Sequence, residues 1–347
     1  MSEYEVEWLS SLAGCDFSEW DDFVNESPQG CVSCYSWWLK TVCKDGFDLL
    51  VLRKEENIVA GVPLIYSSPL SKRFISGRGL SPFQAIMLAK TQKEKYSESL
   101  SEEMKILKNI ISQIPTGTRV QFNCHPNFTN WLPFFWAGFN QTTGYTYICE
   151  NIKHPDIIWG GLRSNIRTDI NKAKKLGLNV AYESDFGIFW DIILKTYKRQ
   201  GRRPSFTRNY LESIYNVSYS HNAGKIIIAY DQNKVPYAGL FYVWTKNTAY
   251  FIISGADPKL RNVGASSFIY WEGILGAAKV ADRVNFCGSV MPAIECVLRG
   301  FGAIQTPCFQ ITKNTLPVFF KVLYELRVMA GKLLRKTGLR YKFLLGS

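Results

Sequence analysis

The segment YFIISGADPKLRNVGASSFIYWEGILGAA, residues 250–278, joins a strand to a helix through a short polar loop. Residues 250–255 are rich in aromatic and β-branched side chains, and residues 265–278 form an apolar run of helical length. A loop that opens a helix presents backbone N–H groups without partners and the positive end of the helix dipole, and both suit a pyrophosphate. The segment therefore predicts a phosphate-binding turn between a strand and a helix.

The turn carries the residues that we predict to bind an acyl donor. Arg261 adds a side-chain cation, and the string RNVGAS, residues 261–266, resembles the Arg/Gln-x-x-Gly-x-Gly/Ala signature with which GNAT acyltransferases hold coenzyme A. Ser266 stands where that signature has Gly or Ala, and a simple turn glycine at position 264 would explain the same string. The predicted donor-binding residues are Ser254, Arg261, Asn262, Val263, Gly264, Ala265 and Ser266.

Several short strings recur in the two halves of the chain. Residues 48–66 and 225–243 both have the pattern of a β-hairpin, with an Ala-Gly pair in the second run at 60–61 and 238–239. Further echoes follow in the same order: Ile-Ser-Gly at 75–77 and 253–255, Arg-Val-x-Phe at 119–122 and 283–286, and Gly-Phe at 138–139 and 300–301. Four echoes in one order indicate a duplicated domain.

Each half has the order helix, antiparallel strands, helix, strand, helix, strand, which predicts an α/β fold with a mixed sheet flanked by helices. We expect an N-terminal GNAT-like domain on the acceptor side over residues 1–152 and a C-terminal GNAT-like domain that binds the acyl donor over 153–315. Residues 316–347 are expected to form a basic amphipathic helix. The first half has no Arg-x-x-Gly-x-Ser string, so only the second half should bind a donor.

The segment RSNIRTDINKAKKLGLNV, residues 163–180, resembles the helix Arg-x-Asn-x-Arg-x-x-Ile-x-Lys-Ala-x-Lys-x-Gly of the FemABX family. The resemblance continues through residues 284–289 and 300–303, and in the first half it covers mainly the order of elements. FemABX proteins are tandem GNAT-fold enzymes, among them peptidoglycan peptidyltransferases that use aminoacyl-tRNA and N-acyltransferases thought to use acyl-CoA. The resemblance implies a transferase and leaves the donor open.

Basic residues lie along this helix and after a later one. On a helical wheel Arg163, Arg167 and Lys174 lie within about 40° of one another. Beside them is an apolar stripe of Ile166, Ile170 and Ala173. We predict that five cations bind the phosphate groups of an acceptor: Arg163, Arg167, Lys174, Arg202 and Arg203. A solvated basic face, or cations at the negative end of a helix dipole, would produce the same pattern.

Acyl transfer to an amine needs a base for the ammonium proton and donors for the tetrahedral oxyanion. We predict Asp257 as the base because it follows the donor strand directly, whereas Glu272 and Glu295 lie in predicted helices. FemABX peptidyltransferases have a Phe-Lys pair before the Phe-Gly near the final strand, and that lysine is linked to stabilising the tetrahedral intermediate. Leu298 occupies its position here, so the resemblance implies that Arg299 substitutes for it or that aminoacyl-tRNA chemistry is absent.

The composition favours an anionic partner. The 347 residues include 41 Lys and Arg against 29 Asp and Glu, and the formal charge of +12 suits nucleotide phosphates, RNA or an anionic membrane face. The nine cysteines have no disulfide spacing and no signal segment is recognised, so we expect a cytoplasmic location. Cys31 and Cys34 have no second Cys or His pair at zinc-finger spacing, so no metal is expected.

The C-terminal segment, residues 316–345, combines apolar residues at helical spacing with many cations. Glu325 is its only acid, and Gly331 and Gly338 interrupt the pattern. Such a helix either lies peripherally on an anionic membrane leaflet or packs on the second half with its cations in water. No window of the chain is long and apolar enough to predict a membrane span.

These patterns together predict an N-acyltransferase that moves an acyl group from acyl-CoA to an amino group of a nucleotide- or lipid-linked sugar or peptide precursor of the cell envelope. The acceptor would lie in the cleft between the halves. An aminoacyl-tRNA donor is the second hypothesis; the net charge favours it and Leu298 disfavours it. The third hypothesis is a non-enzymatic nucleic-acid-binding module, which the lack of an RNA-binding signature disfavours.

Overall fold

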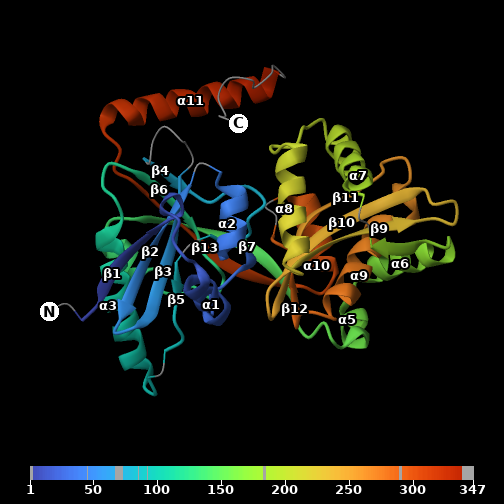
Figure 1. Ribbon diagram of the computed structural model, residues 1–347. Coiled ribbons are helices and arrows are strands. Elements are labelled where there is room, and N and C mark those ends of the chain that lie inside the picture. Colours follow the sequence, from blue (N-terminus) through green and yellow to red (C-terminus); the bar gives the residue numbers. More distant parts are fainter. Residues whose placement is uncertain are drawn as a thin grey trace.

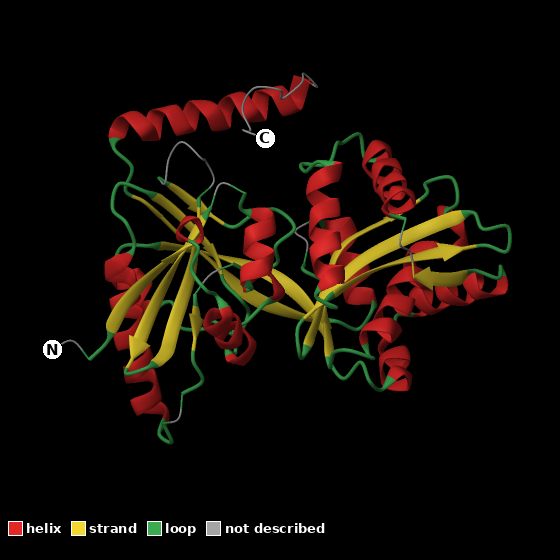
Figure 2. Cartoon of the chain, viewed as in Figure 1, coloured by secondary structure: helices red, strands yellow, loops and turns green. Residues whose placement is uncertain are grey.

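The computed structural model describes residues 3–44, 46–66, 73–84, 86–91, 93–182, 185–288 and 291–337. Figure 1 shows two lobes side by side, with the C-terminal helix along the outside of the first lobe. Strands form the centre of both lobes, and helices cover the sheets (Figure 2). The predicted mixed α/β architecture is therefore confirmed.

The first half runs from strand β1 to strand β7. Its elements are β1 (Glu5–Ser10), η1 (Ser11–Ala13), α1 (Ser18–Glu26), η2 (Val32–Cys34), α2 (Ser36–Val42), β2 (Phe47–Lys54), β3 (Asn57–Ile65), β4 (Phe74–Ser76), β5 (Met87–Leu88), α3 (Tyr96–Gln113), β6 (Arg119–Asn123), α4 (Leu132–Trp136) and β7 (Asn140–Cys149).

The second half repeats this order after two additional helices and ends in a further helix. Its elements are α5 (Pro155–Gly161), α6 (Ser164–Lys175), β8 (Asn179–Tyr182), α7 (Phe186–Arg199), α8 (Arg208–Ser220), β9 (Gly224–Tyr230), β10 (Pro236–Trp244), β11 (Thr248–Ala256), η3 (Arg261–Val263), α9 (Ala265–Ala277), β12 (Arg283–Asn285), α10 (Pro292–Gly300), β13 (Ile304–Asn314) and α11 (Val318–Thr337).

The strands form two sheets, and the larger one crosses both halves. A four-stranded sheet has the order β1-β2-β3-β5, and a nine-stranded sheet has the order β4-β6-β13-β7-β12-β11-β10-β9-β8. Strand β13 of the second half thus lies between β6 and β7 of the first half, and β7 lies between β13 and β12. The sheet runs across the predicted boundary at residue 152, and that boundary stays a prediction.

The exchange of β7 and β13 follows an approximate twofold axis. The two strands pair antiparallel over residues 140–148 and 304–312, with Gly144 opposite Cys308 in the middle. These two residues are 164 positions apart, as are Arg119 and Arg283 at the starts of β6 and β12. Because one offset relates both strand pairs, the two halves are equivalent units that have exchanged their last strands.

Two glycines confirm the equivalence of the hairpins. A Cβ on Gly61 of β3 would lie 2.3 Å from the Trp20 ring of α1, and a Cβ on Gly239 of β10 would lie 2.9 Å from the Phe189 ring of α7. In each half a large aromatic side chain therefore lies directly on the strand backbone, where only glycine leaves room.

The predicted equivalence of the Ile-Ser-Gly strings at residues 75–77 and 253–255 is wrong, because the strand pairing gives a different register. Phe74 of β4 pairs with Arg119, and Thr248 of β11 pairs with the equivalent Arg283. Residue 76 therefore corresponds to residue 250 and not to residue 254. The three-residue β4 is too short to match the long, bulged β11, so the chance recurrence of three common residues misplaced the equivalence.

Helices cover the second lobe on both faces of the sheet. Ile226 and Ile228 of β9 belong to the core that includes residues of α7 and α8. Ile227 and Ala229 belong to the core that includes residues of α9. Alternate side chains of a strand point to opposite faces, so a strand buried on both faces is apolar throughout. The α7 and α8 core continues into the first half through Trp38 and other buried residues, so the two lobes share a hydrophobic core.

The exchanged strand predicts that a residue near the C-terminus stabilises the N-terminal half. Ile311 of β13 is fully buried, pairs with Phe122 of β6 and belongs to the first-half core. Ile311→Ala should lower the free energy of unfolding by about 2–5 kcal/mol, measured by urea titration. Ile304→Ala on the same strand should change it by less than about 0.5 kcal/mol, because Ile304 is 62% exposed. Equal effects of both variants would contradict the exchange.

Candidate functional site

The centre of the candidate site is the point where β11 and β12 diverge. The two strands pair in parallel only from Thr248 to Tyr250 of β11. Directly after this, Phe251 and Ile253 pair with adjacent residues of β10, which leaves Ile252 as a β-bulge. Such a bulge re-aims backbone and side chains next to a site. Residues 252–254 are half-buried, so this side of β11 faces partly open space.

A tight turn after β12 lies on the other side of the candidate site, opposite β11. Cys287 and Gly288 both have positive φ, and the Asn285 Oδ1 accepts a hydrogen bond from the Cys287 N–H at 2.8 Å. A Cβ on Gly288 would fall 2.1 Å from the Tyr145 carbonyl oxygen of β7. Glycine is therefore required here, because a strand from the first half passes directly against the turn.

Aromatic side chains close the divergence on the α9 side. The Tyr270 hydroxyl on α9 lies 2.9 Å from the Ser254 hydroxyl on β11. The Tyr270 ring is 5.8 Å from that of Phe286 and 5.6 Å from that of Phe301. Burial raises the pKa of Tyr270, so its hydroxyl stays protonated at neutral pH and is available as a donor.

The opposite side of the divergence faces the first half. Half-buried Leu80 of the first half and half-buried Phe206, Tyr210, Ile252 and Ile253 of the second half pack against the same shared core. The Tyr210 hydroxyl donates to the Gly79 carbonyl at 2.8 Å and so joins α8 to a first-half loop. Both halves therefore contribute to this side of the site.

The predicted donor turn lies where the sequence placed it, between β11 and α9. Gly264 has φ of +79°, and a Cβ there would fall 2.1 Å from the Asp169 carbonyl oxygen of α6. Gly264 is thus required by the contact with α6, whatever else the turn binds. Asn262 and Ser266 are exposed, and Gly264 has no side chain that could cap the helix. The Arg261 side chain lies outside the described part of the structure.

Helix α6 packs on the donor turn. The Lys172 ammonium donates to the Asn262 carbonyl, and the Ser267 hydroxyl of α9 donates to the Asp169 carboxylate at 3.0 Å. A cation and a carboxylate of α6 therefore both stand beside the α9 N-terminus. Sequence reasoning missed both groups because their partners are almost 100 positions further along the chain.

The predicted apolar stripe of α6 is confirmed, and its three members are the buried residues of the helix. The cations beside it have local partners. Arg167 donates to the carbonyls of Trp159 and Gly160 at the end of α5, and the Lys174 ammonium lies 5.7 Å from the Trp159 ring centroid. The exposed Arg163 guanidinium lies 3.6 Å from the Cys296 sulfur.

The five predicted acceptor cations do not come together. Arg163, Arg167 and Lys174 lie on α6, which packs on α9. Arg202 and Arg203 are exposed in the loop between α7 and α8, on the opposite face of the sheet. The Arg202 guanidinium lies 3.6 Å from the sulfur of Met291, the N-cap residue of α10. Helix α6 and this loop thus lie on opposite faces of the sheet, but Arg163 and Arg202 both reach α10, at Cys296 and at the N-cap residue Met291.

The order of strands, the bulge and the turn into α9 match known folds. Residues 160–289 match the family model of an acetyltransferase (GNAT) domain. The structure of FemX matches with a TM-score of 0.67 at 13% identity, over 92% of this chain and 99% of FemX. A tandem GNAT protein from the clavulanic acid biosynthesis pathway matches with a TM-score of 0.52 at 11% identity, over 90% of this chain and 99% of that protein. The chain has a tandem GNAT fold.

The predicted resemblance to the FemABX family is confirmed by these matches. A conserved protein of unknown function from Bacteroides thetaiotaomicron VPI-5482 has a similar fold, with a TM-score of 0.50 at 10% identity over 84% of this chain and 94% of that protein. No curated protein matches the sequence significantly. Among the described residues, no helix has the length and apolar character of a membrane span.

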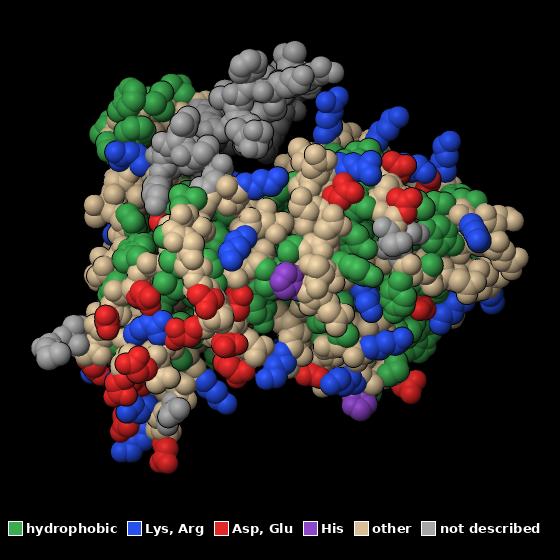
Figure 3. Space-filling view, in the orientation of Figure 1, with side chains coloured by type: hydrophobic (Ala, Val, Ile, Leu, Met, Phe, Trp, Pro, Cys, Tyr) green, Lys and Arg blue, Asp and Glu red, His purple; other side chains and the backbone are tan. Residues whose placement is uncertain are grey.

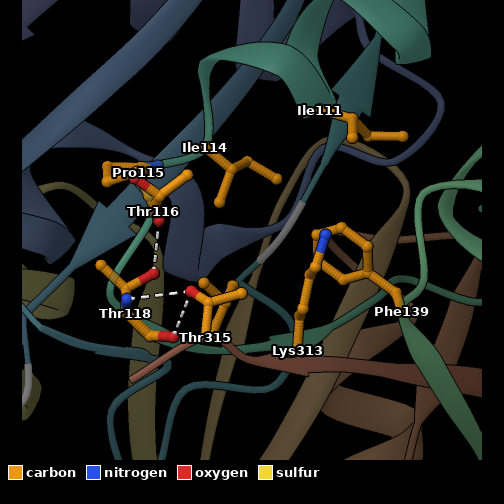
Figure 4. A pocket seen from close by; sticks show the side chains of 9 residues that line it. Ile111, Ile114, Pro115, Thr116, Thr118, Phe139, Lys313 and Thr315 are labelled. Atoms are coloured by element: carbon orange, nitrogen blue, oxygen red, sulfur yellow. Dashed lines mark hydrogen bonds between the residues drawn. The ribbon is translucent and has the colours of Figure 1, made fainter. Parts of the chain in front are cut away.

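The second half has the strand, short loop and helix that a donor turn would need. Strand β11 leads into α9 within nine residues, whereas β4 of the first half ends at Ser76 and the next helix, α3, begins at Tyr96. A small cavity of about 40 Å³ lies in the first half, lined by residues that include Ile111, Phe139 and Lys313 (Figure 4). Such a cavity holds a water molecule or two and no substrate.

The three predicted carboxylates differ in environment. Asp257 is buried, and its hydrogen bond from the Lys195 ammonium at 2.8 Å lowers the pKa of its carboxyl. The hydrogen bond from the Tyr147 hydroxyl lowers the pKa of Glu295. Burial raises the pKa of Glu272, which belongs to α9. An ionised carboxylate that already holds an ammonium group is a poor proton acceptor, so Asp257 has the environment of a structural ion pair.

Leu298, the residue at the position of the FemABX lysine, is uncharged. Leu298 is 2% exposed within the core of the second half. The Arg299 guanidinium lies 3.0 Å from the Glu295 carboxylate, one helical turn away. Arg299 is therefore neutralised on α10, and its replacement of the lysine finds no support in this geometry.

The cysteines of the CxxC string are structural. Cys31 and Cys34 are buried in the shared core, and the Cys34 carbonyl accepts a hydrogen bond from the Trp20 indole. Burial raises the pKa of the Cys31 thiol, which disfavours a reactive thiolate. The described residues contain no group of three or more metal-ligating side chains.

The ion pair between Lys195 and Asp257 predicts a pH-dependent contribution to stability. The pKa of Asp257 is lower in the folded chain than its unfolded value of about 4, so its contribution is present above that value and is lost as the pH falls through the folded pKa. Asp257→Asn should therefore lower the free energy of unfolding at pH 7 and have a smaller effect at pH 3. A loss of turnover without a loss of stability would instead identify Asp257 as the catalytic base.

Proposed function

We propose that the protein is an N-acyltransferase. It moves an acyl group from acyl-CoA to an amino group of a nucleotide- or lipid-linked sugar or peptide precursor of the cell envelope. The observation that carries this proposal is the bulged β11, which diverges from β12 and then turns into α9 in a tandem GNAT fold. The GNAT family model supports a transferase, and the resemblance to FemABX supports the cell envelope.

The donor part of the proposal rests on the turn before α9. The proposed pyrophosphate site consists of backbone N–H groups in residues 261–266, with Lys172 as a nearby cation from α6. The thioester would then extend along β11 to Ser254 and the bulge. A determined structure of the clavulanic acid pathway protein is described as being without AcCoA, which supports this class of donor for a tandem GNAT fold.

The chemical step needs few groups once both substrates are held in place. The neutral amine attacks the thioester carbonyl, the C–S bond breaks, and coenzyme A leaves as the thiolate. The Tyr270 hydroxyl, which lies 2.9 Å from the Ser254 hydroxyl, is the proposed proton donor to the departing sulfur. The proton that the ammonium group releases then returns to the Tyr270 oxygen, because burial disfavours a phenolate there.

We propose that the acceptor binds at the loop between α7 and α8 and not along α6. Arg202 and Arg203 are exposed in the loop after α7, and Thr196 of α7 bonds to the Ala256 carbonyl at the end of β11. Arg167 and Lys174, in contrast, already contact α5. We assign the acceptor phosphate to Arg202 and Arg203, on the side of the site that faces the first half.

Aminoacyl-tRNA is the alternative donor, and one contact favours it. The Asp169 carboxylate bonds to Ser267 in the first turn of α9, so a negative charge already stands where a pyrophosphate would lie. Calorimetric titration of the purified protein with acetyl-CoA and with charged tRNA separates the two donors. Acylation is best followed by mass spectrometry of the acceptor, because the exposed Cys296 would react with thiol reagents.

The donor site predicts a charge effect at Ser266. Ser266→Asp places a carboxylate in the first turn of α9, where the helix dipole stabilises it by about 0.3–1 kcal/mol, so the fold should be retained. The same charge repels a pyrophosphate and should raise the KM for acyl-CoA on the order of tenfold or more. Ser266→Ala is the control and should change KM less than about twofold. An unchanged KM in Ser266→Asp and in Arg261→Ala would move the donor elsewhere.

The acceptor site predicts a selective effect of the α7–α8 loop. Arg202→Ala and Arg203→Ala should each raise the KM for a phosphate-bearing acceptor by roughly tenfold and leave the KM for the donor nearly unchanged. Lys279→Ala removes an exposed cation after α9 and should have no effect. If Arg163→Ala raises the acceptor KM and the loop variants do not, the α6 cations bind the acceptor instead.

A further inference from the structure

Helix α11 lies outside both lobes, and among its described side chains Phe320 and Tyr324 contact the first half. The Tyr324 ring stacks on Phe74 of β4 with centroids 5.6 Å apart. The guanidinium of Arg119 lies 4.7 Å from the Tyr324 ring, and that of Arg73 lies 4.7 Å from the Phe320 ring. The helix is thus held by aromatic and cation–π contacts near its start (Figure 1). The expected packing on the second half is wrong for this part of the helix.

The opposite face of α11 is apolar and exposed. At 100° per residue, its large apolar side chains fall within an arc of roughly 140°, away from Phe320 and Tyr324. Figure 3 shows them as a hydrophobic group at the start of the helix. They are Val318, Phe319, Val322, Leu323, Leu326 and Met329, and they are 47–76% exposed. Contiguous exposed patches of this kind mark an interaction surface.

The charge of the segment identifies its partner. Between Leu316 and Ser347 the sequence has seven cations and one acid, Glu325. The cations are Lys321, Arg327, Lys332, Arg335, Lys336, Arg340 and Lys342, and of their side chains the structure describes that of Lys321. A second copy of the chain would place one basic helix against another, so a self-association is opposed by charge. An anionic surface complements both the cations and the apolar face.

We propose that α11 docks the protein on an anionic lipid surface. The exposed apolar face would enter the boundary between headgroups and acyl chains, and the cations would lie at the headgroups. The Phe320 and Tyr324 side of the helix stays on the first lobe and sets its orientation. This proposal does not rest on the acyltransferase assignment, because it concerns a surface remote from β11 and α9.

Vesicle flotation of the full chain tests the proposal. The protein should float with vesicles of phosphatidylglycerol and phosphatidylcholine, and should stay unbound with pure phosphatidylcholine. Raised salt should weaken the binding. Replacing Lys332, Arg335 and Lys336 by Gln should reduce affinity on the order of a hundredfold, since each cation near the surface contributes about a fivefold effect.

The apolar face is tested by its own variant. Val322→Gln with Leu326→Gln changes two exposed side chains and no contact to the first lobe, so thermal melting should be unaltered while vesicle binding falls by at least roughly tenfold. Ile304→Gln, an exposed apolar residue of β13, is the matched control and should bind like the parent. Equal recovery with both vesicle types, no recovery with either, or a dimer that the double variant abolishes would overturn the proposal.

Discussion

The antiparallel pairing of β7 with β13 is the constraint on which the rest of the structure depends. Each strand belongs in sequence to one half and in space to the sheet of the other, with Gly144 opposite Cys308 near the axis. Backbone hydrogen bonds in this central pair join two sheets that would otherwise each have an open edge. The two lobes therefore have a fixed relative position, and neither sheet is complete without the other half.

This fixed position explains why the candidate site uses both halves. The turn after β12 needs Gly288 because β7 passes 2.1 Å from the place of its absent Cβ. Tyr210 joins α8 to a loop of the first half, and Trp37 of α2 stacks on His221 at the end of α8 with centroids 4.5 Å apart. Both halves of the duplicated fold therefore line the candidate site, and the proposed donor turn belongs to the second half.

Local patterns were predictable from the sequence, and long-range contacts were not. The apolar stripe of α6 and the strand, turn and helix around Gly264 follow from periodicity and turn chemistry over a few residues. The ion pair of Asp257 with Lys195, the contact of Asp169 with Ser267 and the exchange of β13 join residues from 62 to almost 200 positions apart. No spacing rule along one chain reveals such partners. The register of the Ile-Ser-Gly echo failed because three common residues recur by chance.

The place of β13 has a consequence for how the chain is made. Residues 304–314 leave the ribosome long after β6 and β7, yet they pair with both strands in the folded chain. Until then the nascent N-terminal half exposes the edges of β6 and β7 that β13 later covers. Vectorial synthesis therefore cannot complete the first half before β13 is made, and these edges stay open to wrong pairing in the interval.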